Sequence, residues 1–90
     1  MLDCLIIGDS IGVGISDVRK DCAVYAVNGI NSRDWNRRFS NRDLTARVLV
    51  ISLGSNDLEN INTKDELIYL RRVAADSDRV LWIFPAHAVL

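Results

Sequence analysis

Three short loops of this chain contain side chains that could carry out chemistry. Ser10 follows a Gly-Asp pair and offers a hydroxyl nucleophile, while Gly29 has a backbone N–H that no side chain obstructs. Asn56, within Gly-Ser-Asn-Asp at residues 54–57, offers a side-chain amide donor. Attack on an acyl carbon requires a nucleophile together with N–H donors that stabilise the oxyanion. The residues therefore predict such an attack by Ser10, with the Ser10 N–H, the Gly29 N–H and the Asn56 amide as oxyanion donors.

Each loop taken alone also has a purely structural interpretation. Gly-Asp-Ser after a strand can be a turn that leads into a helix cap, and Asn28-Gly29 is a common turn pair. Asn56 and Asp57 tolerate left-handed backbone conformations, so residues 54–57 can form a turn as well. A joint function requires that the fold bring the three loops to one place.

The segments between these loops predict alternating strands and helices. Short apolar runs without strict alternation are typical of strands that are covered on both faces, and they occupy residues 2–7, 23–27, 48–53 and 80–84. Helical features occupy residues 11–20, 32–40 and 63–76. In the last of these, Thr63 and Glu66 have the spacing of a capping box.

The order β-α-β-α-β-α-β predicts an α/β fold, because repeated βαβ units give parallel strands with helices on the faces of the sheet. We expect three layers, a parallel sheet of about four strands, and a single domain over residues 1–90. Ligands of such sheets bind beyond the carboxyl ends of the strands. The three loops each follow a predicted strand, so they should converge at that edge.

In this order, the three loops resemble the conserved blocks of the SGNH or GDSL hydrolases. Leu-Ile-Ile-Gly-Asp-Ser at residues 5–10 is similar to the block with the nucleophilic serine, and residues 28–32 are similar to the block with the oxyanion glycine. Leu-Gly-Ser-Asn-Asp at residues 53–57 matches the G-x-N-D block with the oxyanion asparagine. The resemblance, which extends to bacterial and phage-borne members, implies a flavodoxin-like sheet of order 2-1-3-4. It also implies hydrolysis of small acyl esters, such as O-acetyl groups on carbohydrate, without a metal or cofactor.

The last block of that family, D-x-x-H, has no counterpart in the sequence. No Asp lies three residues before a His, and the only histidine is His87. A serine hydroxyl without a base is a poor nucleophile, so the general base is either missing or is His87. The other interpretation of His87 is a loop or terminal histidine with no catalytic task. The alternative is a catalytically silent SGNH-like structural or binding module, associated with a virion or a cell wall. Such a module would assemble through its fourth strand.

The fourth predicted strand, residues 80–84, also affects the expected partners. Without a fifth strand it becomes a sheet edge with large apolar side chains, which is a hazard for unwanted pairing. We therefore expect that the domain is incomplete at its C-terminus and continues, or that this edge pairs with a second copy or a partner subunit.

Composition excludes several other classes of function. Eleven basic and twelve acidic residues give a net charge of −1, which disfavours binding to nucleic acid or to an anionic membrane. No apolar run approaches the roughly 20 residues of a membrane-spanning helix. Two cysteines are too few for a disulfide scaffold, so we expect Cys4 and Cys22 to be reduced. The protein is then expected in the cytoplasm, or in a virion if it is encoded by a phage.

Two weaker patterns remain in the sequence, one of glycines and one of arginines. The glycines at positions 8, 12 and 14 do not have the spacing of a dinucleotide or phosphate loop, so a nucleotide site is set aside. A basic stretch with interspersed aspartates could contact an anionic glycan or a phosphate, but a solvated face is the favoured interpretation. Its arginines are Arg33, Arg37, Arg38, Arg42 and Arg47.

Overall fold

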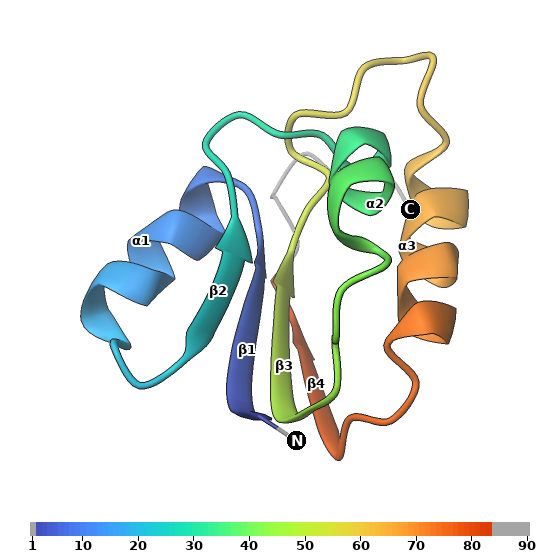
Figure 1. Cartoon of the computed structure of the whole chain (residues 1–90). Helices are drawn as coiled ribbons and strands as arrows, with labels where there is room; N and C mark the ends of the chain where they lie inside the picture. The colour runs from blue at the N-terminus through green and yellow to red at the C-terminus, as the bar shows by residue number, and fades with distance from the viewer. Residues whose placement is uncertain (1, 84–90) are drawn as a thin grey trace.

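The computed structural model of the protein describes residues 2–83 and has the predicted α/β architecture (Figure 1). Its elements are β1 (Leu2–Gly8), α1 (Ser10–Val18), β2 (Ala23–Ala26), α2 (Ser32–Phe39), β3 (Ala46–Ser52), α3 (Thr63–Val73) and β4 (Arg79–Trp82). The strands form an all-parallel sheet in the order β2-β1-β3-β4, which confirms the predicted fold class and strand order. Within residues 2–83, no helix is long and apolar enough to cross a membrane.

The sheet separates two unequal hydrophobic clusters. Helix α1 covers one face, and α2 and α3 lie side by side on the other (Figure 1). Successive residues of β1 alternate between the faces, so Leu5 and Ile7 belong to the larger cluster with α2 and α3, while Ile6 belongs to the smaller one. All three are fully buried, and each contributes about 1.5–3 kcal/mol by leaving water. Burial on both faces explains why the β1 sequence lacks polar alternation.

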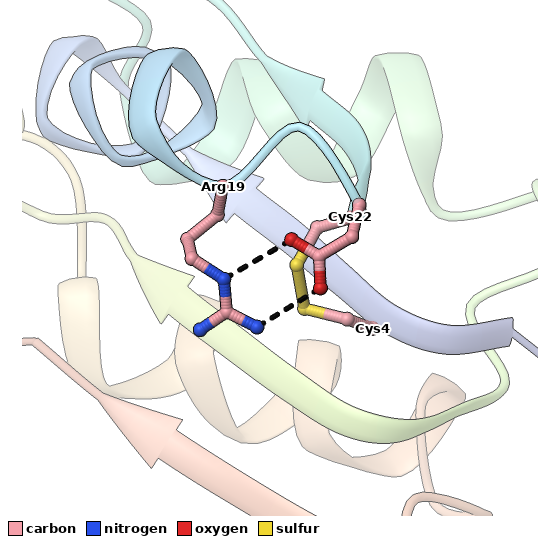
Figure 2. A network of polar contacts seen from close by, with 4 residues as sticks. Cys4, Arg19 and Cys22 are labelled. Atoms are coloured by element: carbon pink, nitrogen blue, oxygen red, sulfur yellow. Dashed lines mark hydrogen bonds and ion pairs between the residues drawn. A yellow bond between two sulfur atoms is a disulfide. The ribbon is translucent and has the colours of Figure 1, made fainter.

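The two cysteines form a disulfide, so the prediction that they are reduced is wrong (Figure 2). Leu5 of β1 is in register with Ala23 of β2, and this pairing places the preceding residues, Cys4 and Cys22, beside each other. Their Cα atoms are 4.7 Å apart, although 18 positions separate them in the sequence. The βα-unit between them is what brings them together. A count of cysteines could not reveal this proximity.

The start of α3 also differs from the prediction. The N-cap is Asn62, whose side-chain Oδ1 accepts a hydrogen bond from the Asp65 N–H at 3.2 Å. Thr63 and Glu66 form no capping box: the Thr63 hydroxyl donates to Asp57, and Glu66 accepts a hydrogen bond from Asn36. Tertiary partners therefore take both side chains away from the local motif. The helix ends at Val73, three residues before the predicted end at position 76.

Candidate active site

The loops that follow β1, β2 and β3 leave the sheet at the same edge (Figure 1). Gly8 at the end of β1 is in register with Ala26 at the end of β2 and with Ser52 at the end of β3. The Val27 N–H donates to the Gly8 carbonyl oxygen at 3.0 Å, and the Asp9 N–H donates to the Ser52 carbonyl oxygen at 3.0 Å. The three loops thus start from one hydrogen-bonded row, as predicted for the carboxyl edge of a parallel sheet.

Gly8 is required by the close approach of β1 and β3 at this row. A Cβ atom on residue 8 would clash with the backbone carbonyl oxygen of Ser52, which has no freedom to move aside. The glycine therefore allows the first loop to begin against the end of β3. This is a packing role.

Asp9 is the buried anchor of the first loop. Its Oδ1 accepts hydrogen bonds from the Ile11 N–H at 3.0 Å and from the Ser52 hydroxyl at 3.4 Å, and its Oδ2 accepts one from the Ser55 hydroxyl at 2.6 Å. The carboxylate caps α1 and is fully buried. Donors from the fold itself bind both of its oxygens, so Asp9 positions the first loop and the start of α1.

Ser10 is exposed at the first position of α1, directly after this anchor. Among residues 2–83, no side chain or backbone group forms a hydrogen bond with its hydroxyl. Its N–H belongs to the first turn of the helix, where amides lack partners within the helix and the helix dipole favours negative charge. The exposure of Ser10 and its place in the first turn of α1 are compatible with roles as nucleophile and oxyanion donor.

Gly29 is exposed in the second loop and has a left-handed backbone with φ of +78°. Side chains are strained in this conformation, although the space around a Cβ atom would be open. The turn interpretation of Gly29 is thus confirmed as a conformational requirement. Glycine has no side chain to cover its own N–H, so the turn and the oxyanion role are compatible.

Asn56 joins the third loop to the second. Its Nδ2 donates at 3.1 Å to the carbonyl oxygen of Ile30, the residue that follows Gly29. A side-chain amide carries two N–H donors, so one remains for a ligand. Together with the bond from Ser55 to Asp9, this contact means that consecutive residues of the third loop hold the first and second loops. The structure thus brings together the loops of Ser10, Gly29 and Asn56.

Asp57 ties the same loop to the two helices behind it. Its Oδ1 accepts from the Ser32 N–H at 2.7 Å, and its Oδ2 accepts from the Ser32 and Thr63 hydroxyls, each at 2.5 Å. The Asp57 N–H also donates to the Gly54 carbonyl oxygen at 3.1 Å, so the turn that the sequence suggested at residues 54–57 is present. Ser32, Ser55 and Thr63 are supporting residues that sequence analysis missed. Their only local signal was a hydroxyl near a helix start or a turn, which is common in any protein.

The candidate base, His87, lies outside the described residues. Because it is the only histidine of the sequence, residues 2–83 contain no imidazole. Within that part of the chain, no group of three or more His, Cys, Asp or Glu side chains is arranged to hold a metal ion.

Comparisons with protein-family models, with curated proteins and with solved structures found no match for this chain. The resemblance to SGNH hydrolases therefore rests on the three loop motifs themselves. The geometry adds an independent fact, since the residues of those motifs hold the three loops to one another.

Proposed function

We propose that this protein is a serine ester hydrolase of the SGNH type that acts on small acyl esters, such as O-acetyl groups on carbohydrate. The observation that carries the proposal is the joining of three loops at the carboxyl edge of the sheet. Ser55 and Asn56 of the third loop donate hydrogen bonds to Asp9 of the first loop and Ile30 of the second. These contacts support the proposal, because they join the loops that contain the Ser10 hydroxyl, the Gly29 N–H and the Asn56 amide.

In the proposed reaction, the Ser10 Oγ attacks the acyl carbon and its proton passes to a base, for which His87 is the candidate. The oxyanion that forms accepts hydrogen bonds from the N–H groups of Ser10 and Gly29 and from the second amide N–H of Asn56. The ester C–O bond then breaks, and the alcohol leaves with the proton from the base. Water attacks the acyl-serine in the same way, releasing the carboxylic acid and restoring Ser10. Each oxyanion donor is typically worth about 2.7–4 kcal/mol of transition-state stabilisation.

The test is labelling of the folded chain by a fluorophosphonate, read as intact mass. We expect one adduct on the wild-type chain and none on Ser10→Ala or His87→Ala, because the probe reacts only with an activated serine. A wild-type chain that is folded yet unlabelled would contradict the proposal. Labelling that survives in His87→Ala would leave the Ser10 assignment in place and remove His87 as the base.

A second candidate function is a silent module of the same fold that assembles through β4. Two observations favour it: β4 is the outermost strand of the sheet within the described residues, and Leu81 on this strand is 55% exposed. An exposed apolar residue on an outer strand is typical of an interaction edge. This candidate predicts a folded, unlabelled chain that associates through β4, so the labelling experiment separates the two functions.

A further inference from the structure

An open groove of about 530 Å³ lies between α3 and β4, on the sheet face that α2 and α3 cover. Its lining combines apolar and basic side chains. The main apolar residues are Leu67, Ile68 and Trp82, and the basic residues are Lys64, Arg71 and Arg72. The candidate active site uses none of these side chains, so the groove is a separate surface feature.

The groove exists because β4 is only partly covered on this face. Val80 and Trp82 of β4 pack against the larger hydrophobic cluster. Within residues 2–83, α3 is the last helix, and no helix follows it to cover the outer side of β4 (Figure 1). Ile68, on the groove side of α3, is 42% exposed. Parallel sheets normally have helices over both faces, so an apolar element of helical size would complete this layer.

The charges of the groove have one sign. Lys64, Arg71 and Arg72 line it, and none of its described lining residues is acidic. Within residues 2–83, these three cations form no ion pair. The acidic residues of the same helix, Asp65 and Glu66, line the cleft toward α2 instead. Helix α3 therefore separates its charges, and its positive side borders the apolar groove.

The stability of α3 does not account for the position of Lys64. The N-terminus of a helix has a partial positive charge, so a cation in the first turn is unfavourable. Lys64 is the second residue of α3, whereas Asp65 and Glu66 in the same turn complement the helix dipole. Lys64, Ile68 and Arg72 are spaced four residues apart, so they form one row on the helix. This row of cation, apolar residue and cation matches a partner with apolar and acidic side chains.

We propose that the α3–β4 groove docks an amphipathic helix of a partner protein, with acidic side chains beside its apolar stripe. The apolar stripe contacts Ile68 and Trp82, and the carboxylates lie beside Lys64 and Arg72. Such helices bind to grooves through apolar residues at every third or fourth position. Helix α3 has 11 residues, a length of about 16 Å, so a partner helix of about three turns matches it. The inference does not rest on the proposed esterase function.

The charges also disfavour two other occupants. A second copy, paired edge to edge at β4 around a two-fold axis perpendicular to the sheet, would bring the same basic residues toward each other. Residues 84–90, which follow the described part of the chain, contain no Asp or Glu. A partner with carboxylates of its own is therefore the occupant that the groove matches.

The test is an NMR titration of the full chain with three synthetic helical peptides that share one leucine stripe. The residues beside the stripe are glutamate in the first peptide, glutamine in the second and lysine in the third. We expect saturable shifts of the Trp82 indole N–H with the glutamate peptide, weaker binding of the glutamine peptide and no binding of the lysine peptide. The indole of Trp35, fully buried in the core, is the internal control and should not move. An unmoved Trp82 signal with the glutamate peptide, or equal binding of the lysine peptide, would overturn the proposal.

Other occupants have distinct signatures in the same experiment. Intermolecular NOEs between two copies at Ile68 would place a second copy in the groove. NOEs between Trp82 and residues 84–90 in the peptide-free chain would place those residues there. Binding to phosphatidylglycerol vesicles in place of the glutamate peptide would assign the surface to a membrane. Each of these results would overturn the proposal.

A charge-swapped variant locates the carboxylates of the partner. Lys64→Glu together with Arg72→Glu reverses two exposed cations. This variant should bind the glutamate peptide about tenfold more weakly and should gain affinity for the lysine peptide, because like charges then face each other in the first complex. Arg37→Glu is the control, since Arg37 is exposed on α2 and does not line the groove. Equal affinities of the swapped variant and the control for the glutamate peptide would overturn the assignment.

Ile68→Gln is a second variant that keeps every charge and removes apolar surface at an exposed position. It should also weaken binding of the glutamate peptide, so the outcome does not depend on the folding of one variant. Unchanged affinity in Ile68→Gln would place the peptide outside the groove and contradict the proposal. The fluorophosphonate result is independent of these measurements, so the two proposals can fail separately.

Discussion

At the residue scale, the proposed reaction gives Asn56 two tasks, and they use different hydrogen atoms of one amide. One N–H donates to Ile30 and holds the second loop, while the other is free for an oxyanion. Asp9 and Asp57 show the contrasting case, since both oxygens of each carboxylate accept from groups that fix the loops. In the candidate site, the two aspartates therefore fix the loops, and Asn56 keeps one N–H that no bond to the loops uses.

Replacing Asn56 with Ala should lower turnover of a small acyl ester by about 10²–10³-fold, because one oxyanion donor is lost. The unfolding free energy should fall by only about 0.5–1.5 kcal/mol, the usual contribution of one hydrogen bond, here the bond to Ile30. Hydrolysis rates and urea unfolding measure the two effects. Asn28→Ala, at an exposed position of the second loop, is the control. Unchanged turnover in Asn56→Ala would remove the residue from the oxyanion site.

Arg19 and Asp21 form an ion pair beside the disulfide (Figure 2). The hydrogen bonds from the Arg19 guanidinium hold the pKa of the Asp21 carboxyl below its ordinary value. A lowered pKa in the folded state stabilises the protein above the unfolded pKa, and this contribution disappears as pH falls through the folded value. Both side chains are well exposed, so solvent screens the effect on stability.

An acid titration monitored by NMR measures the pKa of Asp21 directly. Arg19→Ala should move it upward toward the ordinary value, whereas Arg47→Ala, at another exposed arginine, should leave it in place. An unmoved pKa in Arg19→Ala would show that the pair does not form in solution.

At the scale of elements, the βα-unit from β1 to β2 is closed by a covalent bond. β1 pairs with β2 and β3, whereas β2 has β1 as its partner in the described sheet. The disulfide joins the start of β2 to the start of the central strand, so it secures the outer strand that precedes the Gly29 loop. The bond constrains the unfolded chain as well, because it closes a loop across a sequence separation of 18.

Reduction of the disulfide should lower the unfolding free energy by about 3 kcal/mol, the value expected for a loop of about 15 residues. Urea unfolding with and without a reductant measures this difference. The double variant Cys4→Ser and Cys22→Ser should have the lowered stability and no response to the reductant. If the wild-type chain were equally stable in both conditions, the bond would contribute nothing in solution.

For the whole molecule, the sequence predicts what depends on continuous runs and regular order. The buried stretch around Ile6 predicts a central strand, and the alternation of elements predicts a parallel sheet whose loops share one edge. The sequence does not predict which residues that are distant in the chain form contacts. Glu66 binds Asn36 across 30 positions, and Cys4 meets Cys22 through strand register. These contacts arise when distant segments pack together, and a local motif such as a capping box does not indicate them.

The outer strands of the sheet are the candidate sites of self-association. Within residues 2–83, β4 and β2 are the outer strands, and each has an exposed apolar residue: Leu81 is 55% exposed on β4, and Val24 is 38% exposed on β2. If β4 is the interaction edge, the wild-type chain should self-associate with rising concentration, as measured by light scattering after size exclusion. Leu81→Lys should shift the chain toward monomer, because a lysine on an outer strand opposes pairing. Val24→Lys should leave association unchanged, since it modifies the opposite edge. A wild-type chain that is monomeric at every concentration would exclude self-association through β4, and an effect confined to Val24→Lys would place the interface on β2.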